Sequence, residues 1–99
     1  MSDQLISLEK AKVNLETSQI PWKELQRFFA AGLAIAVAAE LDLVEVAYEF
    51  SQDNKSQVEQ WLKQGLIAAV SDQQAGEWYQ HDSLVWAVVV RPWILVQAR

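Results

Sequence analysis

The stretch over 42–67, DLVEVAYEFSQDNKSQVEQWLKQGLI, constrains the fold more than any other part of the chain. It predicts two short helices joined by a tight polar turn, which is the spacing of a helix-turn-helix. Asp42 and Glu45 have the types and spacing of a capping box at the start of the first helix. Asn54 caps the second helix in the same way, and Gly65 supplies the left-handed residue that ends it. This stretch predicts an architecture, but it does not specify a biochemical function.

The other elements follow from the periodicity of apolar residues. They are a helix over 4–17 with a linker to residue 20, a helix from Pro21 to Gly32, a strand over 33–39, a strand over 66–70, a short helix over 72–80, and strands over 84–90 and 93–97. From the second helix onward, this is the order of a winged-helix domain. We therefore predict an α+β fold in a single domain over 1–99. It has a winged-helix-like three-helix core over 21–99, a small antiparallel sheet and an extra N-terminal helix.

Three local patterns refine this prediction. The strand over 33–39 alternates large residues with alanines, which suits a helix packed closely on its alanine face. Val58, Trp61 and Leu62 form the predicted core face of the second helix of the motif. Ser71 opens the helix over 72–80 with another capping box. The sequence 91–92 is Arg-Pro, a poor match for two-residue hairpin turns, and predicts a bulged or bent strand there.

The helix over 4–17 carries apolar residues on two sides. Leu8, Ala11 and Leu15 share one stripe, and Ile6 and Val13 lie roughly opposite. One interpretation is a single core stripe with two stray surface residues, which is normal for a soluble domain. The other is an arm that packs on its own domain and on a partner subunit.

Composition excludes several classes of protein. The chain has 99 residues, 52% of them hydrophobic, a net charge of −5 and no cysteine. It therefore suits one globular domain without disulfides or cysteine-based metal sites. The longest apolar run, 28–39, is too short to cross a bilayer, and the N-terminus lacks the pattern of a secretory signal. We expect a cytoplasmic protein that does not contact membranes.

The sequence lacks a recognisable catalytic constellation. The single histidine, His81, stands in a polar turn beside Asp82 and Ser83, and adjacent residues do not have the geometry of a catalytic triad. Glu45 and Glu49 share the outer face of a helix, but two carboxylates are fewer ligands than a metal cage normally uses. Three glycines cannot build a phosphate-binding loop in the usual spacings. We predict no catalytic residue, no metal site, no cofactor and no enzymatic activity; a small enzyme or ligand-binding protein is the third hypothesis.

DNA binding is the first alternative, because a winged helix often reads the major groove with the second helix of its motif. The exposed face of that helix would carry Ser56, Gln60, Lys63 and Gln64, which can hydrogen-bond base edges. Residues 41–70, however, hold five acids and two bases, so the charge there repels phosphates. We therefore expect a protein partner or a second copy of the chain instead of nucleic acid.

Contact with protein is the preferred hypothesis. The strands VWAVVV and WILV can pair with another chain at a sheet edge, unless they are central and covered. The predicted interaction surface consists of Ser56, Gln60, Lys63, Gln64 and Trp93. We predict a non-enzymatic interaction or regulatory module that associates with itself.

Four segments resemble a known family. They are PWKELQRFFAAG over 21–32, LDLVEVAYEF over 41–50, VEQWLKQGLI over 58–67 and WAVVVRPWILVQ over 86–97. Together they resemble small bacterial proteins grouped as domain of unknown function 2288. Two positions depart from the family pattern: Pro21 replaces a threonine helix cap, and Ala38-Ala39 replaces a proline-containing turn, which affects the end of the first strand. The resemblance implies a bacterial, cytoplasmic domain and transfers no activity, ligand or catalytic residue.

Overall fold

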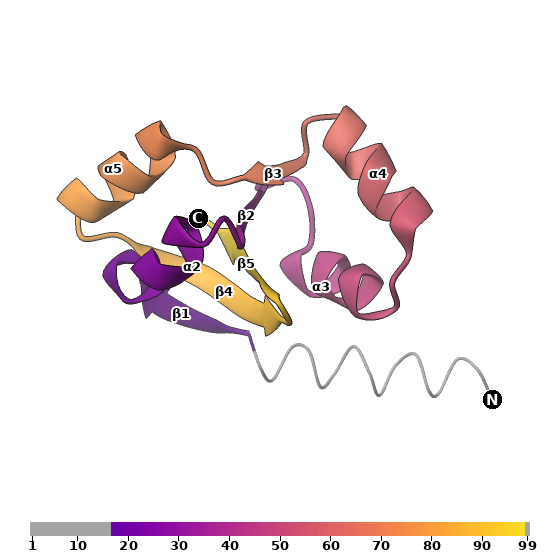
Figure 1. Cartoon of the computed structure of the whole chain (residues 1–99), viewed down its shortest axis with the longest axis horizontal. Helices are drawn as coiled ribbons and strands as arrows, with labels where there is room; N and C mark the ends of the chain where they lie inside the picture. Colours follow the sequence, from indigo (N-terminus) through magenta and orange to yellow (C-terminus); the bar gives the residue numbers. More distant parts are fainter. Residues whose placement is uncertain (1–16, 99) are drawn as a thin grey trace.

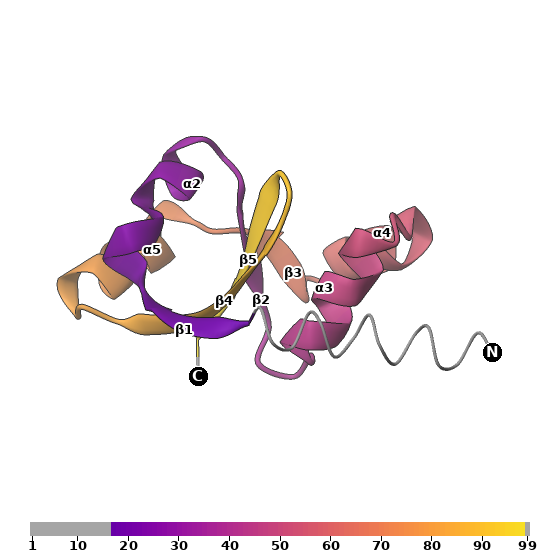
Figure 2. The same cartoon turned by 90° about the horizontal axis from the view of Figure 1, so that it is seen from below.

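The described part of the chain is built around one mixed β-sheet with helices on both of its faces (Figures 1 and 2). This computed structural model describes residues 17–98. The elements are β1 Ser18–Pro21, the 3₁₀ helix η1 Trp22–Leu25, α2 Gln26–Ala30, β2 Ala34–Val37, α3 Leu43–Ser51, α4 Lys55–Lys63, β3 Ile67–Ala69, α5 Asp72–Gln80, β4 Leu84–Val90 and β5 Trp93–Gln97. The α+β class is confirmed. The predicted N-terminal helix over 4–17 lies outside the described residues except for its last residue, Thr17.

The strand order is β1-β4-β5-β2-β3, and β5 lies at the centre. All neighbouring strands are antiparallel except β2 and β5, which run parallel with Ile35 opposite Leu95. The prediction of a small antiparallel sheet is therefore wrong. A hairpin fixes strand direction, but β2 reaches β5 only after three helices and two further strands, so no local turn sets their relative direction.

β1 corrects a second prediction, because the linker expected before residue 21 is an edge strand. It pairs with β4, placing Ser18 opposite Ala87 and Pro21 opposite Leu84. The segment has no run of β-prone residues of its own. Its conformation depends on a partner strand more than sixty residues away, which local periodicity does not register.

The helices are divided between the two faces of the sheet. On the first face, η1, α2 and α5 cover a core that includes Trp22, Ala34 and Ala75. On the second face, α3 and α4 cover a separate core that includes Leu43, Trp61 and Leu95. Alternation along the strands explains the division, because successive side chains point to opposite faces. A winged-helix-like three-helix core is not confirmed, since the helices do not gather on one side.

The predicted helix boundaries of the central motif are confirmed. The Asp42 carboxylate accepts a hydrogen bond from Val44 N at 3.0 Å, and the Asn54 side-chain oxygen accepts one from Gln57 N at 3.4 Å. Gly65 has φ 73°, the left-handed conformation that ends α4. Ser71 and Gln74 form a complete capping box for α5.

The alanine face of β2 also behaves as predicted. Ala34 is buried and Ala36 partly buried in the first-face core, where Trp22, Phe28 and Phe29 from η1 and α2 pack. The small side chains allow this helical segment to lie close to the sheet.

The β4–β5 connection is tighter than predicted. Val90 pairs with Trp93, so Arg91 and Pro92 alone form the turn, and the peptide bond between them is cis. A cis proline at the third position defines a type VI turn, which does not need the glycine or asparagine of the commoner hairpin turns. The predicted bulge is therefore wrong. Among the residues that the structure describes, no helix is long and apolar enough to cross a membrane.

Candidate interaction surface

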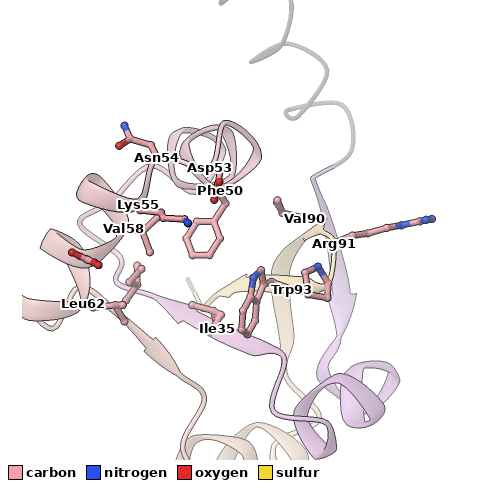
Figure 3. Close-up of a pocket in the computed structure, with 13 residues that line it drawn as sticks. Ile35, Phe50, Asp53, Asn54, Lys55, Val58, Leu62, Val90, Arg91 and Trp93 are labelled. Atoms are coloured by element: carbon pink, nitrogen blue, oxygen red, sulfur yellow. The ribbon is translucent and has the colours of Figure 1, made fainter.

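An open groove of about 430 Å³ lies on the second face, between α4 and the β4–β5 turn (Figure 3). Its walls are mostly apolar and come from six strands and helices and two turns. The lining residues are Ile35, Phe50, Asp53, Asn54, Lys55, Val58, Glu59, Leu62, Ile67, Val90, Arg91, Pro92 and Trp93. Figure 3 shows Phe50, Val58 and Leu62 on one side of the groove and Ile35 and Trp93 on the other.

Strand alternation and helical spacing aim these side chains into the groove. Ile35 lies between two alanines that face the opposite core, so its side chain points to the second face. Val58 and Leu62 are four residues apart on α4 and therefore share one stripe. Trp93 is the first residue of β5, directly after the turn. Its side chain lies on the second face and is half-buried.

Leu62 corrects the predicted core face of α4. Trp61 is 9% exposed and belongs to the core, whereas Leu62 is 49% exposed at the groove. The apolar stripe of α4 is wider than the sheet beneath it, so its outer residue extends past the core. A half-exposed leucine leaves apolar area available for a contact.

Charged side chains of both signs surround the apolar walls. In Figure 3 the Lys55 nitrogen points toward the Phe50 ring, and the Arg91 side chain extends away from the groove. Asp53 and Glu59 contribute the negative charges. Asn54 Nδ2 donates to Glu49 Oε2 at 2.6 Å, which ties α3 to the start of α4. The groove therefore combines mostly apolar walls with charged side chains of both signs.

The sheet ends beside this groove at β3, whose residue Ile67 also lines it. Within the described residues, β3 pairs with β2 on one side and has no strand on the other. Ala68 and Ala69 are exposed, and the segment over 66–70 carries no charge and no proline. Charged residues and proline commonly protect natural edge strands; in the described part of the chain β3 has neither, and its only such feature is its length of three residues.

The predicted surface residues are only partly brought together. Trp93 lines the groove, as a surface residue should. Ser56, Gln60 and Lys63 are exposed on α4, and Gln64 is exposed at its C-cap, but these residues do not line the groove. The sequence analysis did not include Ile35, Phe50 and Val90 in the interaction surface, although they line the groove. Their apolar character is the available signal, but it was interpreted as belonging to the core.

The residues considered for chemistry lie apart from the groove. His81 is exposed at the C-terminal end of α5, and Glu45 is exposed on α3. Across residues 17–98, no three histidine, aspartate or glutamate side chains gather in a way that could hold a metal ion. The absence of enzymatic activity stays a prediction from the sequence.

Comparison with known proteins places the chain in a family. A family model described as protein of unknown function DUF2288 matches residues 9–98. The chain belongs to this family. The chain is also similar to PA1075 from Pseudomonas aeruginosa, known from an NMR solution structure, with 39% identity and a TM-score of 0.80. That match covers 96% of this chain and 85% of PA1075. No curated protein matches this DUF2288 member.

Proposed function

We propose that this DUF2288 protein is a non-enzymatic protein–protein interaction module that associates with itself through the groove and the β3 edge. The observation that carries the proposal is the 49% exposure of Leu62 in a groove that also includes Ile67 of β3. An apolar surface and a strand edge that has no neighbour within the described residues thus meet on one side of the molecule. Contact with a second copy would remove both from water.

The character of the groove favours a protein contact over catalysis. Small-molecule sites usually combine an enclosed apolar pocket with a few convergent polar groups. Here Arg91 points away from the groove, and most of the lining residues are apolar. An apolar centre with a polar rim is the usual anatomy of a protein interface.

The test is the molar mass of the full chain by light scattering over a micromolar concentration series. We expect a mass above 11.2 kDa that falls on dilution. Leu62→Gln should shift the series toward monomer, because a polar side chain no longer gains from burial at the contact.

Leu84→Gln is the matched control, because Leu84 is 51% exposed but lies at the other end of the sheet, next to β1. Its mass series should match that of the wild-type protein. A clean monomer throughout the series would overturn the proposal. Equal effects of the two leucine variants would also contradict it.

A winged-helix DNA-binding regulator is the second candidate, favoured by the exposed polar side chains of Ser56, Gln60 and Lys63 on α4. Its charge is unfavourable, since Glu59 stands on the same helix and Glu45 is exposed on α3. A mobility shift with a salt series separates the two candidates. Tight binding that weakens steeply as salt rises would favour DNA over self-association.

A further inference from the structure

The phase of the hydrogen bonds along β3 shows which of its backbone groups face outward. Val70 N donates to Ala34 O at 3.0 Å, and Ala38 N donates to Leu66 O at 2.8 Å. Bonded and non-bonded pairs alternate along an antiparallel ladder, so Ala68 also faces β2. The N–H and C=O groups of Ile67 and Ala69 therefore point away from the sheet.

The opposite edge of the sheet has a protective device that β3 lacks. On β1, Trp22 N donates to Ser83 O at 2.9 Å, so the same alternation turns Pro21 outward. Proline has no N–H and cannot donate to an added strand. Pairing with another chain is thus disfavoured at β1, while both outward donors of β3 are available.

We propose that two copies of this chain pair antiparallel through β3, with Ala68 on the two-fold axis. This inference rests on the proposed self-association and names its geometry. Ile67 of each copy would exchange both backbone hydrogen bonds with Ala69 of the other copy. The two Ala68 residues would form a non-hydrogen-bonded pair, in which Cα atoms approach to about 4.5 Å. Alanine fits this close approach.

Charge complementarity supports the antiparallel direction. Lys63 ends α4 on the N-terminal side of β3, and Asp72 begins α5 on its C-terminal side. In both views of the molecule, α4 and α5 stand at opposite ends of β3 (Figures 1 and 2). The two-fold axis would bring Lys63 of one copy and Asp72 of the second copy to the same end of the paired strands, and the reverse. A parallel arrangement would place like charges together.

The helix dipoles act in the same direction. The C-terminal end of α4 carries partial negative charge, and the N-terminal end of α5 carries partial positive charge. Antiparallel pairing would bring these unlike ends to the same end of the paired strands, with α4 on the second face and α5 on the first. On the groove side, Ala69 of the second copy would lie beside Ile67 and Leu62. The pairing would therefore cover part of the apolar surface as well as the strand edge.

Charge reversal tests the geometry. Lys63→Glu alone, or Asp72→Lys alone, should raise the dimer dissociation constant about tenfold, because two symmetric attractions become repulsions. The double variant K63E/D72K should return it to within about threefold of the wild-type value. The dimer dissociation constants are measured by sedimentation equilibrium. A thermal melt of each variant shows whether it is folded.

A second measurement uses the unmodified chain. Hydrogen exchange should show protection of the Ile67 and Ala69 amides that increases with protein concentration, while the Ala68 amide is protected at every concentration.

Ala69→Pro copies the device found at Pro21 and should abolish dimers, because it removes an outward donor but no bond of the β2–β3 ladder.

Dimers that are insensitive to charge reversal, or whose Ile67 and Ala69 amides exchange freely, would overturn this geometry and leave self-association standing. A double variant that fails to restore dimers would do the same. A monomer at all concentrations would overturn both proposals.

Discussion

The two faces of the sheet are both covered by apolar side chains from helices, but they differ in how completely those side chains are buried. On the first face, Trp22 is fully buried and meets Trp78 edge-on, with 5.0 Å between ring centroids, and Phe29 at 5.9 Å. On the second face, Leu43 is equally well buried, but Leu62 extends into an open groove. The first face is closed by packed aromatic side chains, and the second combines a core with exposed apolar surface at the groove.

The faces also differ in what holds their helices. Aromatic rings attach η1 and α5 to the first face. On the second face, buried Gln97 donates from Nε2 to Ala38 O at 2.7 Å and to Leu41 O at 2.8 Å. These bonds fix the loop that leads into α3. A buried polar side chain therefore contributes to holding the second-face helices through this loop.

The largest expected effect is on the first face. Trp22→Ala should destabilise the fold by about 3–5 kcal/mol, because it removes a fully buried indole and leaves a cavity. Urea denaturation followed by far-UV circular dichroism measures the loss. Trp93→Ala is the comparison, since Trp93 is only half-buried at the groove. An equal loss for both variants would break the distinction between the faces.

The next effect concerns the polar anchor. Gln97→Leu should cost about 2–3 kcal/mol, since it leaves the carbonyls of Ala38 and Leu41 without their side-chain donor in a buried place. The same denaturation experiment applies. Gln19→Leu, on the exposed part of β1, should stay within about 0.5 kcal/mol of wild type. If the two variants proved alike, Gln97 would not be an anchor.

A moderate effect is expected at the start of α5. Ser71→Ala should cost about 1 kcal/mol, because the Ser71 Oγ accepts from Gln74 N at 3.1 Å and the change leaves that N–H uncapped. Thermal unfolding would show the loss. Ser71→Asp should retain most of the stability, because aspartate is also a good cap.

The smallest effect on stability is expected at the groove. Leu62→Gln should change the free energy of unfolding of the monomer by no more than about 0.5 kcal/mol, because the side chain is half exposed. The measurement is made by urea denaturation at a concentration where the protein is monomeric. A large loss would show that Leu62 belongs to the core, as the helical pattern alone had predicted.

Elements with local signals could be predicted from the sequence. Asp42, Asn54 and Ser71 mark helix starts that the structure confirms, because a cap depends on residues within one turn. Gly65 marks a helix end for the same reason. These signals explain why α3, α4 and α5 were predicted closely.

Features that depend on distant partners could not. β1 becomes a strand because β4 accepts it, and β2 runs parallel to β5 across most of the chain. The separation of the helices onto two faces follows from that sheet and was missed with it. A hydrophobic stripe on α4 likewise does not reveal how far the sheet extends beneath Leu62.

The candidate site was predicted in part. Trp93 belongs to the interaction surface predicted from the sequence, and it lines the groove. Lys63 was predicted on the helix face that could contact DNA, and it lies at the end of α4 beside the β3 edge. In the proposed dimer its charge would be opposite to that of Asp72 at the same end of the strand pair. The groove itself could not be predicted, because it forms where α4 and the β4–β5 turn lie close together in the fold, and these segments are far apart in the sequence.

The central position of β5 also has a consequence for synthesis. Within the described sheet, β5 at residues 93–97 stands between β1 and β4 on one side and β2 and β3 on the other. A chain emerging from the ribosome makes β1, β2, β3 and β4 before the strand that unites them. Until β5 is available, both halves of the sheet expose edges, so the nascent protein relies on its last strand to become one folded unit.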